Sequence, residues 1–137
     1  MAEVDILGMR YLGIDYGARW TGIAVSDDDG NMAFPKATFE AKSDTARIRE
    51  IGKIIKSENV RRIVVGLPIQ MNGREGASAT RTRAFASKIQ KRFGLSIFFE
   101  NEILTSRISS QDHSSKERVD ARAAALILQS YLDRLHM

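Results

Sequence analysis

The stretch RYLGIDYGARWTGIAVS, residues 10–26, contains the pattern that decides the fold. Its two apolar runs, residues 10–16 and 21–26, are separated by a short segment that begins with glycine, which predicts two strands joined by a hairpin turn. Asp15 lies near the end of the first run, on the same pleat face as Gly13. Because Gly13 has no side chain, we expect open space beside the Asp15 carboxylate.

Beyond this hairpin, hydrophobic periodicity predicts one more strand and then an alternation of helices and strands. The turn-forming sequence DDDGN precedes the third strand, which completes an antiparallel meander. The expected elements are a strand at 32–39, a helix from Ser43 or Asp44 to 58, a buried strand at 61–67, a helix at 77–93, a strand at 95–99 and a helix from Glu117 or Arg118 to 135. A meander followed by two crossovers gives a mixed five-stranded α/β sheet with helices on both faces, which is the topology of the ribonuclease H-like fold. The order of the strands is not visible from the pattern.

Length and composition limit the classes of protein to which the chain can belong. With 137 residues, 43% of them hydrophobic and 28% charged, it is long enough for one core and too short for two ordinary domains. We therefore expect a flexible leader at residues 1–9 and a single domain at 10–137. No apolar run is long enough to cross a bilayer, and residues 1–9 lack a secretory pattern. We expect a cytoplasmic protein with no membrane partner, either a monomer or a weak dimer.

Charge and cysteine content narrow the choice of ligands. Lys and Arg number 21 against 17 Asp and Glu, a net charge of +4, which mildly favours a polyanionic partner such as nucleic acid. Cysteine is absent, so disulfides and thiolate metal sites are excluded and any metal is held by oxygen or imidazole ligands. We interpret His113 and His136 as surface residues, and Trp20, Phe34 and Phe39 as packing residues of the core or of a sheet edge.

Three acidic residues are candidates for a catalytic site. Asp15 ends the first strand, Glu102 follows the fifth, and Asp120 heads the apolar stripe of the last helix. If the first and fifth strands flank the fourth, their carboxyl ends open on one edge and bring Asp15 near Glu102. Each acid also has an ordinary interpretation: Asp15 as the partner of an arginine, Asp120 as a charge favoured by the helix dipole, and Glu102 as an exposed turn residue. Glu100 is an equal rival to Glu102, because it lies two residues earlier on the same pleat face.

Carboxylates that converge in this way predict a site for hard cations. Mg²⁺ or Mn²⁺ suits oxygen ligands, and Mg²⁺ retains waters and completes its shell with substrate phosphate oxygens. In a two-metal site one ion lowers the pKa of the attacking water and the other stabilises the leaving oxygen. We therefore expect Asp15, Glu102 and Asp120 to be both the metal ligands and the catalytic residues of a nuclease.

Arginines and glycines near the expected site complete the prediction. Arg19, Arg74 and Arg81 are candidate contacts for nucleic-acid phosphates. The loop after the central strand contains three glycines, which permit close approach of a ligand to the backbone. The glycines that we expect to shape the site are Gly13, Gly17, Gly66, Gly73 and Gly76.

The order of these motifs resembles that of the bacterial YqgF family. The motifs are GIDYG at 13–17 with GIAVSD at 22–27, VVGLP at 64–68 with MNG at 71–73 and EG at 75–76, EILTS at 102–106, and VDARAAALILQSYL at 119–132. Members of this family are described as candidate pre-16S rRNA nucleases or as Holliday-junction-resolvase-like proteins. The resemblance implies a ribonuclease H-like fold, a cytoplasmic location, and a role in ribosome biogenesis. The role is trimming of the 5′ end of pre-16S rRNA, either free or on the small ribosomal subunit.

The resemblance also transfers the acidic triad of the family onto Asp15, Glu102 and Asp120, and so favours Glu102 over Glu100. The chain departs from the family pattern in three places. Trp20 stands in the first hairpin where the family has arginine, Asn101 and Ile103 flank Glu102 in place of Asp and Arg, and the segment at 105–119 is shorter and has fewer lysines. These departures remove positive charge near the expected site.

Other functions remain open from the sequence. The same three acids would serve a Holliday junction resolvase that cuts branched DNA, and a ribonuclease H-like domain that has lost its chemistry would bind nucleic acid without cutting it. An ATPase of the actin and sugar-kinase type also has an Asp-x-Gly hairpin, but those enzymes close two domains over the nucleotide and 137 residues cannot supply both.

Overall fold

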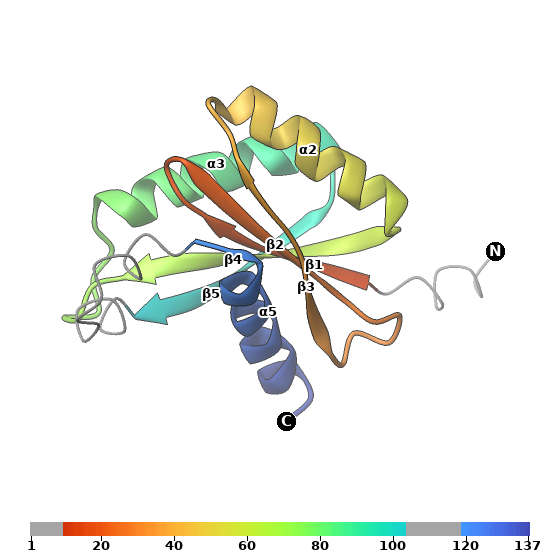
Figure 1. The fold of residues 1–137 in the computed structure, drawn as a ribbon. Helices are drawn as coiled ribbons and strands as arrows, with labels where there is room; N and C mark the ends of the chain where they lie inside the picture. The colour runs from red at the N-terminus through yellow and green to blue at the C-terminus, as the bar shows by residue number, and fades with distance from the viewer. Residues whose placement is uncertain (1–9, 104–118) are drawn as a thin grey trace.

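A five-stranded mixed sheet forms the centre of the computed structural model, which describes residues 10–103 and 119–137 (Figure 1). The elements are β1 (Arg10–Tyr16), β2 (Trp20–Ser26), β3 (Ala33–Glu40), α2 (Asp44–Ser57), β4 (Val60–Ile69), α3 (Ala77–Phe93), β5 (Ser96–Ile103) and α5 (Ala121–Leu135). The predicted leader at 1–9 and the polar segment at 104–118 lie outside the described residues. The order and type of the elements confirm the fold class predicted from the sequence.

The strand order is β3-β2-β1-β4-β5. β1, β2 and β3 pair antiparallel, whereas β4 and β5 run parallel to β1, so β1 and β5 flank β4 as the expected site requires. The carboxyl ends of these three parallel strands therefore meet at one edge of the sheet.

Helices cover both faces of the sheet, and each face has its own core. α2 and α3 lie on one face, over a cluster that includes Ile14, Ile63 and Phe85, and α5 crosses the other (Figure 1). On the α5 face, Val64 of the sheet packs with Leu128 of the helix. No helix in residues 10–103 or 119–137 is long and apolar enough to span a bilayer.

Two predicted boundaries are wrong in ways that affect the site. β5 continues through Ile103, because β4 itself continues to Ile69 and pairs with it, so Glu102 lies inside the strand opposite Pro68 and not after it. α5 begins at Ala121 and not at residue 117 or 118. The buried stripe of α5 ends on Leu132, and Leu135 in the last turn is 49% exposed.

Candidate active site

A pocket of about 260 Å³ opens at the edge of the sheet where β1 and β5 end. Asp15 and Glu102 both line it, as does Gly66 on the strand between them. Asp15 is only 3% exposed, and Glu102 is half-buried. A buried carboxylate is costly unless it has a polar, charged or metal partner, so a pocket with two such groups has the donor chemistry of a hard-cation site.

Glu100 and Glu102 lie two residues apart on β5, but their surroundings differ. Glu100 is buried against α5, where its carboxylate accepts a hydrogen bond from Ser130 Oγ at 2.6 Å and forms an ion pair with Arg134. Glu102 lies one pleat further along the strand and lines the pocket together with Asp15. The structure thus distinguishes two acids that the pleat pattern could not separate.

Asp120 does not line the pocket. Its backbone is extended, with φ −148° and ψ 178°, and its carboxylate caps α5 by accepting a hydrogen bond from the Ala123 amide at 2.9 Å. Arg122 lies 3.3 Å from the other carboxylate oxygen. Asp120 is thus the N-cap of α5, where the helix dipole favours a negative charge, and it does not lie within the helix stripe.

The backbone of Asp120 nevertheless lies close to Asp15. A Cβ added to Gly22 would be 2.1 Å from the Asp120 carbonyl oxygen, and Gly22 is the cross-strand partner of Asp15. Glycine at position 22 is therefore what lets the start of α5 lie directly on the sheet. Among residues 10–103 and 119–137, no group of three acidic or histidine side chains is close enough to hold a metal ion. Asp15 and Glu102 thus share the pocket, whereas the backbone of Asp120 lies over β2, the strand next to β1.

Two of the three predicted arginines line the pocket. Arg19 belongs to the β1–β2 turn and pairs with Glu40, and Arg81 comes from the first half of α3 and donates a hydrogen bond to Ser78 Oγ at 3.2 Å. Arg74 is not a lining residue. It lies in the turn after β4, where its amide donates a hydrogen bond to Asn72 Oδ1 at 2.9 Å. The pocket is thus lined by two arginines, from the β1–β2 turn and from α3, as well as by two acidic residues.

A family model described as "RuvX: Holliday junction resolvase" matches residues 9–134 of the chain. The chain belongs to the RuvX family. Two relatives carry the name "Putative pre-16S rRNA nuclease". The relative from Anaeromyxobacter sp. strain Fw109-5 is 39% identical over 93% of this chain and 99% of its own, and that from Oleidesulfovibrio alaskensis is 38% identical over 91% and 92%. These matches confirm the YqgF family indicated by the sequence motifs, because the two names found here are the two descriptions given for that family above.

A solved structure supports the fold of this RuvX-family chain. Thermus thermophilus RuvC in complex with a Holliday junction substrate aligns with a TM-score of 0.56 over 94% of this chain and 97% of the RuvC chain, at 12% sequence identity. At this level of identity the similarity concerns the fold alone. It agrees with the ribonuclease H-like topology that the order of helices and strands predicts.

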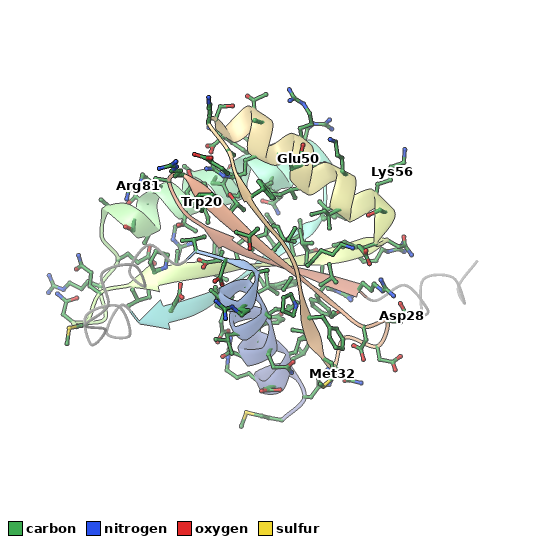
Figure 2. All side chains as sticks on the ribbon, viewed as in Figure 1. Trp20, Asp28, Met32, Glu50, Lys56 and Arg81 are labelled. Atoms are coloured by element: carbon green, nitrogen blue, oxygen red, sulfur yellow. The ribbon has the colours of Figure 1, made fainter. Side chains whose placement is uncertain are left out.

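Trp20 is a pocket residue that the sequence interpretation missed. The sequence predicts that it packs in the core or at an edge, but it is half-buried and lines the pocket of the RuvX-family chain together with Arg19 and Arg81. Figure 2 labels Trp20 and Arg81. The guanidinium of Arg19 lies 5.7 Å from the centre of its ring. Its position in the sequence could have predicted this role. A residue that follows the turn after Asp15 lies at the same edge of the sheet as Asp15.

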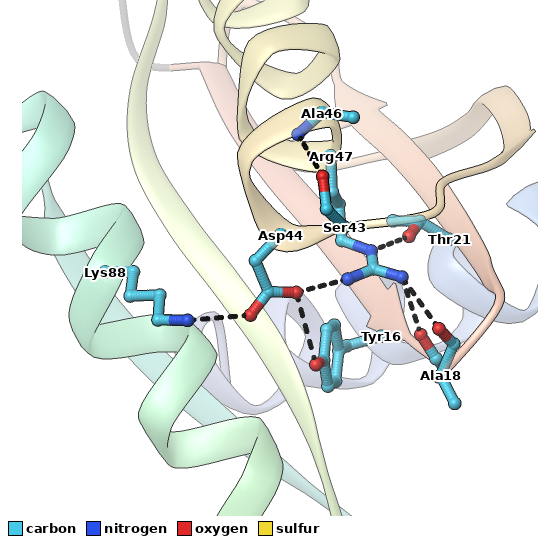
Figure 3. A network of polar contacts seen from close by, with 9 residues as sticks. Tyr16, Ala18, Thr21, Ser43, Asp44, Ala46, Arg47 and Lys88 are labelled. Carbon is cyan, nitrogen blue, oxygen red and sulfur yellow. Dashed lines mark hydrogen bonds and ion pairs between the residues drawn. The ribbon is translucent and has the colours of Figure 1, made fainter.

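Arg47 is a second residue that the sequence interpretation missed, and Figure 3 shows its contacts with the β1–β2 turn and with Asp44. Its side chain is only 2% exposed. It forms an ion pair with Asp44, donates hydrogen bonds to Thr21 Oγ1 at 2.6 Å and to the Gly17 and Ala18 carbonyl oxygens at 3.1 Å each, and lies 4.8 Å from the ring centre of Tyr16. The β1–β2 turn, which lines the pocket, is therefore tied to α2. The missed signal is spacing, since position 47 lies on the same helix stripe as Ile51 and Ile54.

The network around Arg47 extends to α3. Asp44 accepts a hydrogen bond from the Tyr16 hydroxyl at 3.4 Å and pairs with Lys88 of α3 at 3.1 Å. Burial, and after it the negative charge of Asp44, raises the pKa of the Tyr16 hydroxyl. The tyrosine therefore remains protonated and donates to the carboxylate at neutral pH.

The predicted glycines have different roles in the structure. The expected open space beside Gly13 is absent, because a Cβ there would lie 2.8 Å from Leu128 Cβ, so this glycine admits α5 to the sheet and leaves no cavity. Gly17 and Gly66 do line the pocket. Gly73 adopts a φ of +82°, which glycine tolerates best, in the turn after β4. Gly76 precedes α3, packed against the side chain of Gln70.

Proposed function

We propose that this protein is a metal-dependent nuclease that hydrolyses phosphodiester bonds in structured nucleic acid, and that its substrate is the 5′ end of pre-16S rRNA. The observation that carries the proposal is one pocket lined by two acidic residues, Asp15 and Glu102, and by two arginines, Arg19 and Arg81. Carboxylates bind hard cations, and arginines bind phosphate in a bidentate manner. A metal ion held by the acids would act on the reacting phosphate, and the arginines would bind its charge.

The residues of the pocket fit Mg²⁺ or Mn²⁺. Mg²⁺ sites in enzymes that act on phosphates usually use one or two carboxylates, with waters and substrate oxygens as the other ligands, and Asp15 and Glu102 supply two such groups. When bound, the metal would lower the pKa of the attacking water and stabilise charge on the leaving oxygen.

Asp120 is our candidate for a third ligand. Its backbone lies over Gly22, next to Asp15, while its carboxylate bonds to the Ala123 amide. Loss of such a cap costs about 1 kcal/mol, and a divalent ion with several oxygen ligands can offset a cost of that size. Rotation of one side chain would then bring the Asp120 carboxylate toward the pocket.

The other lining residues would bind and orient the substrate. Arg19 and Arg81 would hold phosphates on either side of the reacting one, and their positive charge would stabilise the charge that develops in the transition state. Trp20 offers an aromatic ring beside Arg19, on which an unpaired base can stack. We place this activity in the cytoplasm, on precursor rRNA that is free or within the small ribosomal subunit, by a monomer or weak dimer.

The choice of RNA follows the names of the two relatives, which match this chain over nearly all of its length. A four-way DNA junction is the second candidate substrate, favoured by the description of the family model. The pocket chemistry serves both, since a metal ion and two arginines recognise phosphate and not the sugar.

The test is cleavage by the purified chain of an RNA with the 5′ end of pre-16S rRNA, next to a four-way DNA junction, with and without Mg²⁺. We expect Mg²⁺-dependent cleavage of the RNA, and we expect Asp15→Asn to slow it by about 10³-fold or more. The matched control is Asp29→Asn, an exposed acid in the β2–β3 turn, which should cleave like the wild type. Cleavage of the junction alone would show that the substrate is branched DNA and not pre-16S rRNA. Binding of both substrates without any cleavage would indicate a domain that has lost its chemistry, and would overturn the proposal.

A further inference from the structure

We propose that the groove between α2 and α3 binds the phosphate backbone of the same nucleic-acid substrate, beyond the segment that occupies the pocket. This inference rests on the proposed function and extends it to the substrate's footprint. The groove has a volume of about 620 Å³ and is lined by four cationic side chains, Arg49, Lys53, Lys56 and Arg92.

Close packing of the two helices forms the floor of the groove. A Cβ added to Gly52 of α2 would lie 3.0 Å from two ring atoms of Phe93 on α3. Phe93 and Ile48 therefore make an apolar floor, and the long basic side chains project from the helices on either side of it. Such side chains keep their charged ends in water and accessible to a ligand.

The cations of the groove are weakly neutralised. Arg49, Lys56 and Arg92 form no ion pair with any residue in 10–103 or 119–137. Lys53 pairs with Glu50 at 3.1 Å, but the lysine is 67% and the glutamate 46% exposed, and exposed pairs of this kind contribute little. Several like charges along one groove raise the local concentration of a polyanion.

A row of cations on α3 connects the groove to the pocket. Arg81, Lys88 and Arg92 are spaced by seven and then four residues, so they lie on one stripe of the helix. Arg81 lines the pocket, Lys88 reaches Asp44 on α2, and Arg92 lines the groove. At 1.5 Å of rise per residue, the row spans about 16 Å. Figure 2 shows Arg81 and Lys56 toward opposite ends of this layer of helices.

This continuity favours a nucleic-acid strand over an acidic protein. A strand whose reacting phosphate lies in the pocket would place further phosphates along the row, because the backbone repeats its charge every few ångströms. An acidic peptide would have no comparable reason to follow a row that begins at a metal and phosphate site.

The experiment compares two double variants with the same change in charge. Lys56→Gln with Arg92→Gln removes two groove cations, and Lys42→Gln with Lys91→Gln removes two exposed cations that line neither the groove nor the pocket. Each is tested on a short RNA that fills the pocket only and on the same RNA extended by ten nucleotides at each end. The groove variant should bind the extended RNA about 10-fold more weakly, and its plot of log Kd against log salt should lose a slope of about 1.4 to 1.8. Its binding to the short RNA should match that of the wild type.

Three results would overturn the inference: equal weakening by both double variants, equal weakening on both RNAs, or competition by polyglutamate as strong as that by RNA of the same charge. Its failure is distinguishable from failure of the proposed function. If the groove variant cleaves the short RNA at the wild-type rate and its affinity for the extended RNA is unchanged, the groove does not bind RNA, and the proposed nuclease function still holds. If the binding results are as expected but the wild type cleaves neither RNA, the groove binds RNA and the proposed nuclease function is wrong.

Discussion

Acidic side chains lie at both ends of the β-sheet, and at one end two of them line a pocket. At the end where β1 and β4 begin, Glu58 lies 2.6 Å from Arg10 and 2.7 Å from Lys36, and Arg10 also lies 2.7 Å from Asp28. At the opposite end, Asp15 and Glu102 line a pocket of about 260 Å³ together with two arginines. The first end has the local neutrality of a structural ion cluster. The second has space for a ligand among its charges.

The difference shows that an acid near a strand terminus is not by itself a sign of function. Glu58 and Glu102 are both half-buried and both lie near an end of a parallel strand. Their neighbours distinguish them, because cations fix the carboxylate of Glu58 on two sides, whereas Glu102 lies at the wall of a cavity. Substitutions at the two ends should therefore have different consequences for activity and for stability.

Between the glutamates of the two ends, the larger effect is expected at Glu102. Glu102→Gln removes a negative charge from the pocket and should lower Mg²⁺-dependent cleavage by about 10³-fold, equivalent to about 4 kcal/mol in the activation free energy. The melting temperature should change little, because the side chain lies at a pocket and not in the core. Single-turnover cleavage of the RNA, with thermal unfolding followed by circular dichroism, measures both.

Glu100→Gln is the matched control for this prediction. It changes the same residue type two positions earlier, where the carboxylate contacts Ser130 and Arg134 on α5. It should lower stability by about 1 to 3 kcal/mol, since a hydrogen bond to a charged group is lost, and leave cleavage by the folded protein near the wild-type rate. A larger loss of cleavage in Glu100→Gln than in Glu102→Gln would show that the wrong glutamate has been assigned.

A smaller effect, on stability, is expected at Arg47, which supports the pocket end. Arg47→Met should destabilise the protein by about 3 kcal/mol, because it leaves the Asp44 carboxylate and two turn carbonyls without their buried donor. Urea unfolding at neutral pH measures this change. Arg49→Met, on the same helix but exposed, should change stability by less than about 0.5 kcal/mol. Equal effects of the two substitutions would mean that the pocket does not depend on the buried network.

Much of the fold could be predicted from the sequence because its signals are local. The bounds of β1 and α3 were predicted as observed, since an apolar alternation specifies the first and Gly76 and Gly94 enclose the second. β5 was predicted too short, because its last residues are polar and are held in the sheet by pairing with β4, a contact between distant parts of the chain.

The site could be predicted only in part, because its geometry depends on contacts that are far apart in sequence. That Asp15 and Glu102 share an edge follows from strand order, and the family pattern favoured Glu102 over Glu100. The pairing of Glu100 with Arg134 depends on where α5 crosses the sheet, which no local pattern gives. The same crossing fills the space beside Gly13, which the sequence pattern left open.

The smallest effect is expected at Glu58, at the paired end. Its hydrogen bond with Lys36 is the main cause that lowers the pKa of its carboxyl, burial opposes this, and the charges of Lys36 and Arg10 lower it further. A carboxyl whose pKa is lowered by folding adds stability above its unfolded pKa of about 4.3, and this stability is lost as the pH falls through the folded value. Glu58→Gln should therefore lower stability by less than about 1 kcal/mol at pH 7, and the two proteins should converge near pH 2. Urea unfolding at both pH values measures this, with RNA cleavage at pH 7 expected to be unchanged. A difference in stability that persists at the lower pH, or a loss of cleavage, would remove the distinction between the paired end and the pocket end.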